Sequence, residues 1–92
     1  MKTPKQLAAL ERILKALANR RRLAIILYLK RVKSASVGDI AEAIDLSFKA
    51  TSKHLSILLH TDILEKEQRS LLVFYKLSDT PSSLHKRLID IF

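Results

Sequence analysis

Leucines recur at steps of three and four residues near the start of the chain, which is the spacing of one face of an α-helix. They stand at Leu7, Leu10, Leu14 and Leu17. Thr3-Pro4 precedes them, and this pair is a common helix start because threonine caps free backbone N–H groups and proline fits the first turn. The pattern predicts a first helix with a continuous apolar face.

A second helix is expected after Asn19, which is a good N-cap residue. Its predicted inner face consists of Leu23, Ile26 and Leu27, with the aliphatic stem of Lys30 as a further candidate. Three arginines at 20–22 crowd its first turn, where positive charge opposes the helix dipole. Either an anionic partner compensates, or these arginines form a solvated basic corner. An internal ion pair of Arg22 with Asp39 or Glu42 is a further option.

Two short segments then predict a helix-turn-helix. A polar break at 34–36, open to an extended conformation, leads into Ser36-Val37-Gly38-Asp39, which has the form of a capping box. The apolar residues of the short third helix that follows are Val37, Ile40, Ala41 and Ile44. Only Asp45-Leu46 separates it from a fourth helix capped by Ser47. A short amphipathic helix, a tight turn and a second helix form this motif.

The fourth helix has two different faces. Its inner face holds Thr51, Leu55, Leu58 and Leu59, and its outer face holds Phe48, Lys49, Ser52, Lys53 and Ser56. A ring and a cation in the first turn are unusual for a purely structural helix, because the dipole favours acidic residues there. The outer face therefore suggests an anionic partner. A solvated surface with one exposed ring is the alternative.

The pattern changes from helical to alternating after Thr61-Asp62. β-Branched and aromatic residues gather in 71–77, and together with 63–67 they predict a β-hairpin with a polar, basic tip around Arg69. Thr80-Pro81 repeats the helix start signal. The apolar face of the last helix is then formed by Leu84, Leu88 and Ile91.

Charge indicates a polyanion as the partner. The 92 residues contain 17 Lys and Arg against 9 Asp and Glu, which leaves a net charge of +8. Nucleic acid is the first expectation for such a field. An anionic membrane surface is the competing target, but no apolar run approaches the ~20 residues of a spanning helix. Length predicts one domain over residues 1–92, and the absence of a signal peptide predicts a cytoplasmic protein.

The amino-acid composition argues against an enzyme. The chain has no cysteine, one glycine and three scattered histidines, so disulfides, thiolate metal sites and a glycine-rich phosphate loop are excluded. No cofactor is expected. A winged helix that binds only other proteins remains the alternative function, since fold does not determine function. The charge of +8 and the basic outer face of the fourth helix favour DNA.

The order of helix, helix, short helix, polar-faced helix, hairpin and helix is that of a winged helix-turn-helix with flanking helices. From Leu14 to Leu77 the chain closely resembles the ArsR/SmtB family of dimeric bacterial and archaeal repressors. The similar blocks are Leu17-Ala18-Asn19-Arg20-Arg21-Arg22-Leu23, Ser52-Lys53-His54-Leu55 and Phe74-Tyr75-Lys76-Leu77. Arg20 replaces a family proline, and Ser70 replaces the glycine of the family's wing.

The resemblance implies a mostly α fold with a β-hairpin wing and with N- and C-terminal dimerisation helices. It also implies a sequence-specific transcriptional regulator, a repressor that binds double-stranded DNA at a palindromic operator as a homodimer. The side chains expected at the DNA are Ser47, Phe48, Lys49, Ser52, Lys53, His54, Arg69 and Arg21. Those expected at the dimer interface are Leu7, Leu10, Leu14, Leu17, Leu84, Leu88 and Ile91.

Two of the expected DNA contacts have alternatives. His54 lies between the two faces of its helix, so a half-buried imidazole bonded to backbone is as good an interpretation as a phosphate contact. Arg69 either follows the DNA backbone, enters the minor groove or is an exposed loop arginine without a role.

The departures from the family concern its metal sensors. Ser36 and Gly38 occupy the positions of the family's Cys-x-Cys, and Ala41 replaces a further cysteine. His85 and Asp90 are the only candidates for a second family metal site, and at five residues apart they do not share a helix face. No metal site is therefore expected, and no effector is indicated.

Overall fold

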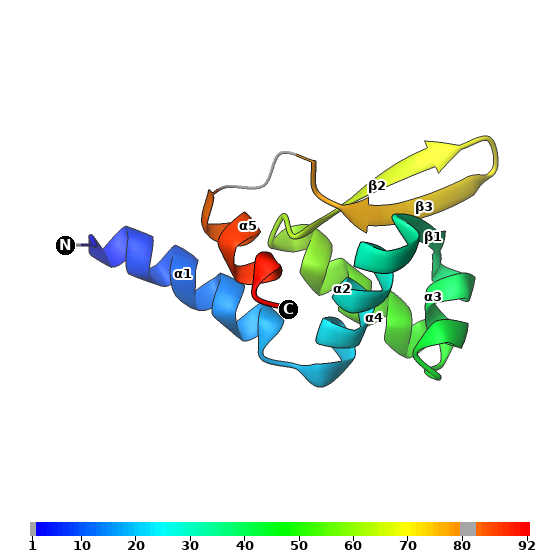
Figure 1. Cartoon of the computed structure of the whole chain (residues 1–92), viewed down its shortest axis with the longest axis horizontal. Coiled ribbons are helices and arrows are strands. Elements are labelled where there is room, and N and C mark those ends of the chain that lie inside the picture. Colours follow the sequence, from blue (N-terminus) through cyan, green and yellow to red (C-terminus); the bar gives the residue numbers. More distant parts are fainter. Residues whose placement is uncertain (1, 80–82) are drawn as a thin grey trace.

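The computed structural model describes residues 2–79 and 83–92, except for the side chains of 83 and 84. Helices make up most of the molecule, and a hairpin projects from one end of it (Figure 1). The elements in order are α1 Pro4–Leu17, α2 Arg20–Val32, β1 Ser34–Ser36, α3 Val37–Ala43, α4 Phe48–His60, β2 Leu64–Arg69, β3 Leu72–Leu77 and α5 Ser83–Asp90. The predicted winged helix-turn-helix with flanking helices is confirmed.

Helices α1 to α4 begin at the polar side chains that the sequence marks. The caps are Thr3, Asn19, Ser36 and Ser47. The Asn19 side chain accepts hydrogen bonds from the backbone N–H groups of Arg21 and Arg22, and Ser47 accepts one from Ala50 at 3.1 Å. These bonds satisfy donors that a helix start leaves unpaired. The start signal at Thr80-Pro81 lies outside the described residues.

The wing is a three-stranded antiparallel sheet of order β1-β3-β2, one strand more than the predicted hairpin. Strand β1 has only three residues, too short for a periodic pattern, and it forms because the free edge of β3 offers it partners. Ala35 pairs with Tyr75 in this ladder and is buried. The sheet thus ties the wing to the segment between α2 and α3.

The core gathers apolar side chains from all the helices and from the base of the wing. It consists of Ile13, Ala16, Leu17, Ile25, Ile26, Leu29, Ala35, Ile40, Leu55, Leu58, Ile63, Leu64 and Ile89. The predicted inner face of α2 is wrong at Leu27, which is 50% exposed. Helix α2 instead buries Ile25 and Leu29, because α1, α4 and the sheet cover a wider arc of it than one stripe.

Basic side chains cap the C-terminal ends of three helices. The Arg22 guanidinium donates to the carbonyls of Ala16 and Lys15 at the end of α1, at 2.5 and 3.2 Å. This corrects the expected ion pair of Arg22 with an acidic residue of α3. Lys30 donates to the carbonyl of Ile89 in the last turn of α5 and to the backbone oxygen of Phe92. These cations satisfy orphan carbonyls and oppose the negative end of the dipole.

The C-terminal end of α4 has two such donors. Arg12 of α1 donates to the His60 carbonyl at 2.9 Å, and His85 Nε2 of α5 contacts the Thr61 carbonyl at 2.8 Å. Because a carbonyl only accepts, that ring nitrogen carries a proton. The first and last helices are therefore both bonded to the end of the fourth.

Four turns use positive φ at residues other than glycine. They are Lys33, Asp45, Asp62 and Ser70, with φ of 77°, 54°, 60° and 59°. Aspartate tolerates this region better than most residues. Lys33 follows α2 and has a side chain with no such advantage. Its backbone conformation is therefore strained.

Replacing Lys33 by glycine is expected to raise the free energy of unfolding by about 1 kcal/mol, because a β-carbon at positive φ costs about that much. Lys33→Ala is the matched control, since both variants lose the hydrogen bond from Lys33 Nζ to the Lys30 carbonyl. Urea denaturation of the two variants measures the difference. Equal stabilities would show that the backbone at this position is unstrained.

Candidate nucleic-acid interface

Helix α4 presents one buried face and one exposed face, as its sequence predicts. Thr51, Leu55 and Leu58 are at most 1% exposed, whereas the Phe48 side chain is 64% exposed. An aromatic ring left in water at the start of a helix gains nothing from the protein's own core. The outer face of α4 is therefore available for contact with another molecule.

The polar residues predicted at the DNA surround that ring. Lys49 and Lys53 are exposed and lie one helical turn apart, and Ser52 between them is half-buried. Ser47 is exposed, and its hydroxyl oxygen accepts the capping bond while its O–H can still donate. The structure brings these four residues and Phe48 together in the first two turns of α4. Ser56, further along the same face, is also exposed.

His54 lies at the junction of α4 with α2. Its Nδ1 is 3.2 Å from Nη1 of Arg22, and because a guanidinium only donates, Nδ1 accepts and the ring proton is on Nε2. Burial, Arg22 and Arg21 lower the pKa of His54 below its ordinary value of 6.5. The imidazole is therefore half-buried and neutral at pH 7, bonded to a side chain rather than to backbone.

Positive charge is concentrated on two helices. Helix α2 carries Arg20, Arg21, Arg22, Lys30 and Arg31, and α4 carries Lys49 and Lys53. Neither helix contains an acidic residue. Arg22 and Lys30 are used to cap helix ends, whereas Arg21 is exposed at the start of α2. The field of Arg21 reaches His54, so this arginine extends the basic surface of α4.

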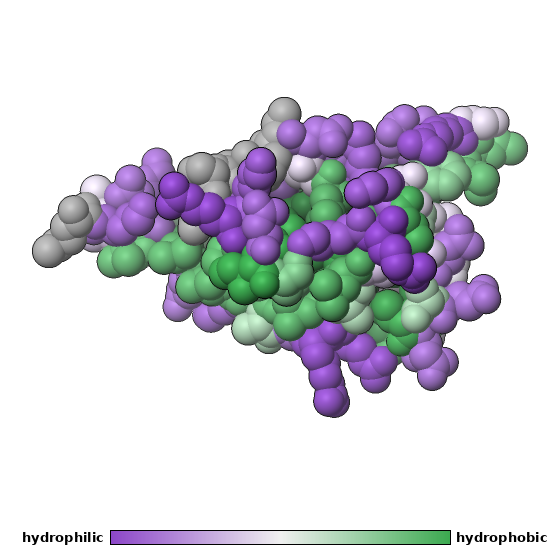
Figure 2. All heavy atoms as spheres, viewed as in Figure 1, coloured by the Kyte–Doolittle hydropathy of each residue, from purple (hydrophilic) through white to green (hydrophobic). Residues whose placement is uncertain are grey.

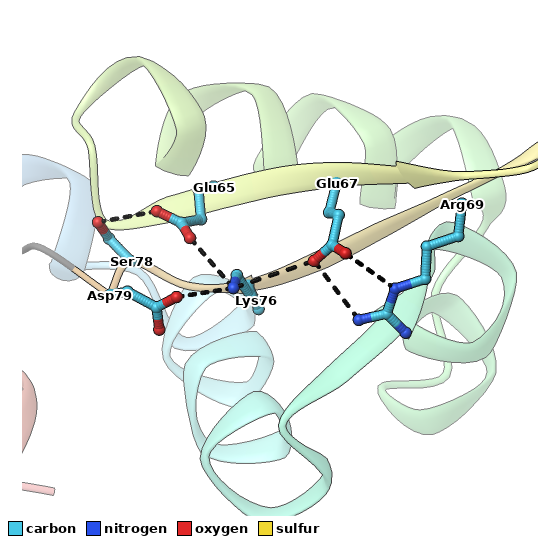
Figure 3. A network of polar contacts seen from close by, with 6 residues as sticks. All are labelled: Glu65, Glu67, Arg69, Lys76, Ser78 and Asp79. Carbon is cyan, nitrogen blue, oxygen red and sulfur yellow. Dashed lines mark hydrogen bonds and ion pairs between the residues drawn. The ribbon is translucent and has the colours of Figure 1, made fainter.

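The wing carries a connected network of opposite charges (Figure 3). Lys76 Nζ lies 3.3 Å from Glu65 and 2.7 Å from Asp79, and Arg69 Nε lies 3.2 Å from Glu67. The Arg69 guanidinium also lies over the Phe74 ring, 4.8 Å from its centre. The acidic neighbours raise the pKa of Lys76, and the Arg69 hydrogen bond lowers that of Glu67. The arginine predicted to contact DNA thus has partners within the wing.

The end of the wing differs from the predicted polar, basic tip. Ser70 and Leu71 form the turn, and Leu71 is 92% exposed. Leu72, the first residue of β3, is 59% exposed. The alternating pattern of 71–77 predicted a strand but not where it begins, so it did not indicate that a leucine stands at the turn.

The apolar residues predicted at a dimer interface differ in their exposure, and three of them lie on the surface. Leu7 is 53% exposed, Leu14 is 44% exposed and Ile91 is 76% exposed. Leu7, Leu10 and Leu14 line a shallow apolar hollow along α1, and Figure 2 shows hydrophobic residues along the underside of this helix. Leu17 is buried in the protomer's own core, Leu88 packs against that core, and the side chain of Leu84 lies outside the described residues.

No group of three His, Cys, Asp or Glu side chains suited to a metal ion occurs within 2–79 and 83–92. Across the same part of the chain, no helix has both the length and the apolar character needed to cross a membrane.

The family model of bacterial regulatory proteins of the arsR family matches residues 19–66, which include the whole helix-turn-helix and the first half of β2. The chain belongs to the arsR family. This arsR-family regulator has the winged helix-turn-helix fold within the matched region and beyond it.

Individual proteins are similar over more of the regulator's length. The transcriptional activator HlyU of Vibrio cholerae is 38% identical over 68 residues, which are 74% of this chain and 62% of that relative. The solved structure of HlyU from Vibrio cholerae N16961 has a TM-score of 0.82 and 34% identity, covering 97% of this chain and 92% of that chain.

A Mycobacterium bovis structure extends this similarity. It is described as a homodimeric winged helix-turn-helix DNA-binding domain of a possible ArsR-family transcriptional regulator. It shares a TM-score of 0.82 and 25% identity, over 98% of this regulator and 82% of that chain. The likeness therefore includes α1 and α5, which lie outside residues 19–66.

The stability of the regulator should depend on pH through His54. In the unfolded chain this residue titrates near 6.5 and in the folded protein it titrates lower, so between the two values the unfolded state binds more protons. The contribution of His54 to the free energy of unfolding is complete above pH 6.5, and it is lost as the pH falls through the pKa of the folded protein. Urea denaturation from pH ~8 to ~5 should show a shallower fall for His54→Gln than for the wild type. If the free energy of unfolding of both proteins fell equally with pH, the lowered pKa of His54 would be contradicted.

Proposed function

We propose that this arsR-family chain is a sequence-specific repressor that binds a palindromic operator as a homodimer. The presence of two different uncovered surfaces on one small domain supports this above the other observations. A basic face free of acidic residues covers the first turns of α4, and an uncovered apolar face runs along α1. A second copy would cover the apolar face, and DNA would neutralise the basic one.

Each side chain of α4 has a role that follows from its chemistry. Lys49 and the Ser52 hydroxyl can donate to base edges in a major groove, and the exposed Phe48 ring can contact a thymine methyl. Lys53, Ser47 and Arg21 are placed for phosphates, which position the protein without specifying sequence. His54 supports Arg22, and its Nε2–H can donate to a phosphate. Arg69 adds a DNA contact at the wing if its guanidinium leaves Glu67 and binds a phosphate instead.

Dimerisation follows from the surface of α1. Leu7, Leu10 and Leu14 form an apolar strip along α1, and the Ile91 side chain is also exposed. A small domain buries limited apolar surface alone, and most soluble oligomers form closed two-fold dimers. The homodimeric Mycobacterium bovis relative supports this arrangement. We also propose that residues 1–92 act as one domain, located in the cytoplasm with its DNA.

The site should follow the symmetry of the dimer. Two α4 helices related by a two-fold axis require an imperfect palindrome whose half-sites lie about one helical turn, roughly 10 bp, or a multiple apart. Repression follows where such a dimer covers a promoter, although the Vibrio cholerae relative is named an activator. A promoter fused to a reporter distinguishes the two roles, since occupancy lowers its output in one case and raises it in the other.

Selection of bound fragments from a random duplex pool tests the proposal directly. Enrichment of an imperfect palindrome supports it. Recovery of no common sequence, with weak and salt-sensitive binding to every duplex, would instead favour a winged helix that binds proteins.

Replacing Phe48 or Lys49 by alanine should weaken binding to the selected operator more than binding to a scrambled duplex, by about 1–3 kcal/mol per lost base contact. Lys53→Ala is the matched comparison on the same helix. Because it removes a phosphate contact, it should weaken both duplexes alike and flatten the slope of log affinity against log salt by about 2 units in the dimer. Fluorescence titrations at several salt concentrations measure both effects. An unchanged operator preference in Phe48→Ala and Lys49→Ala would show that α4 does not contact bases.

Leu7→Asp is expected to convert the dimer into a folded monomer, because it places an unpaired carboxylate in the contact along α1. The matched control is Leu27→Asp on α2, since the two leucines are 53% and 50% exposed. Sedimentation at micromolar concentration gives the mass, and circular dichroism checks the fold. A Leu7→Asp variant that sediments as a dimer would place the interface elsewhere.

A further inference from the structure

The turn of the wing exposes two adjacent leucines, and this is the most unusual feature of the surface. Leu71 is 92% exposed and Leu72 is 59% exposed. In the view of Figure 2 the far end of the wing is hydrophobic, whereas most of its length is hydrophilic. Transfer of a leucine side chain out of water is worth about 1.5–3 kcal/mol. A partner that buries this tip would therefore gain free energy from it.

The tip is held in one conformation. Arg69 pairs with Leu72 in the β2–β3 ladder, directly below the turn. Ser70 has a φ of 59°, and its carbonyl accepts a hydrogen bond from the Gln68 side chain at 3.3 Å. The ladder and this bond fix the backbone of the turn, so the strands present Leu71 at a defined place at the end of the wing.

The wing carries little net charge with which to attract DNA. Residues 64–79 contain three acidic and three basic side chains, which cancel. Arg69 is bonded to Glu67 and stacked on Phe74, and Lys76 is held by Glu65 and Asp79. The neutral apolar end therefore cannot act mainly by charge, unlike the exposed lysines of α4.

The tip lies at the same end of the molecule as the helix-turn-helix. In Figure 1 the wing tip and α3 are at the end opposite the N-terminus, and α4 begins only a short turn after α3. Contacts between α4 and β2 join the wing to this helix. A duplex with α4 in its major groove would thus meet the wing at the adjoining minor groove.

We propose that Leu71 is an apolar wedge that enters the minor groove beside the operator and partly unstacks one base step. Leu72 packs against the sugar edges below it. The inference rests on the proposed DNA binding and adds a specificity-determining residue to it. Leucine is a side chain suited to such insertion, which bends the duplex. The preferred steps are pyrimidine–purine steps, which unstack most easily, so Leu71 selects sequence without any hydrogen bond.

The test combines two variants of the tip with two versions of the selected operator. Leu71→Ser removes the wedge, and Leu71→Arg replaces it by a charged tip. Leu27→Ser is the matched control for loss of an exposed leucine on α2. The operator is used with a pyrimidine–purine step in the adjoining minor groove and with that step changed to purine–pyrimidine. 2-Aminopurine beside the step reports unstacking, and energy transfer between labelled duplex ends reports bending.

The wild type should raise 2-aminopurine fluorescence and bend the duplex with the flexible step. Leu71→Ser should abolish the fluorescence rise, reduce the bend and weaken binding about tenfold to that duplex, with little effect on the other. Its salt slope should stay unchanged, because no charge is lost. Leu71→Arg should regain affinity with a steeper salt slope but without the fluorescence rise. Leu27→Ser should match the wild type throughout.

Three results would overturn the wedge. Wild-type fluorescence and affinity in Leu71→Ser, with operator binding intact, would show that the tip does not enter the duplex while leaving DNA recognition by α4 standing. A changed sedimentation coefficient of DNA-free Leu71→Ser would identify the tip as a contact between protein copies. Failure of the wild type to bind any selected duplex would instead overturn the proposed function itself.

Discussion

The Arg22 guanidinium joins the three helices on which the arrangement depends. It belongs to the first turn of α2, donates to the last carbonyls of α1 and donates to His54 of α4. One planar cation with five donors can satisfy groups in three directions, which a lysine ammonium at the same place cannot match. In a dimer built on α1, this contact holds α4 at a set distance from the two-fold axis.

The basic residues divide into a structural set and a free set, and their number alone overstates the charge available for DNA. Arg12, Arg22 and Lys30 cap helix ends, and Lys76 neutralises acidic residues of the wing. The exposed set at the starts of α2 and α4 is smaller, with Arg20, Arg21, Lys49 and Lys53 as its members. Helix caps lie where backbone carbonyls are unpaired, so these cations serve folding first.

Apolar surface remains outside the core on α1 and at the wing tip for the same physical reason. A chain of 92 residues cannot enclose every leucine, because its surface is large relative to its volume. Helix α1 therefore buries Ile13 and Leu17 on one side and exposes Leu7 and Leu14 on the other. The wing has only one packed face at its base and none at its tip, which leaves Leu71 uncovered. Each place faces a different proposed partner, a second copy or a duplex.

The sequence by itself determined the starts of α1 to α4, the two faces of α4 and the family, because caps, periodicity and motifs act over a few residues. Tertiary structure alone decided the third strand of the sheet, the exposure of Leu27 and the bonds of Arg22, His54 and Arg69. These depend on which elements come together, since an edge strand forms where another edge is free and a side chain is buried where a neighbour covers it. The pairing of Arg69 with Leu72 places Leu71 at the turn. The local sequence pattern does not specify this strand register.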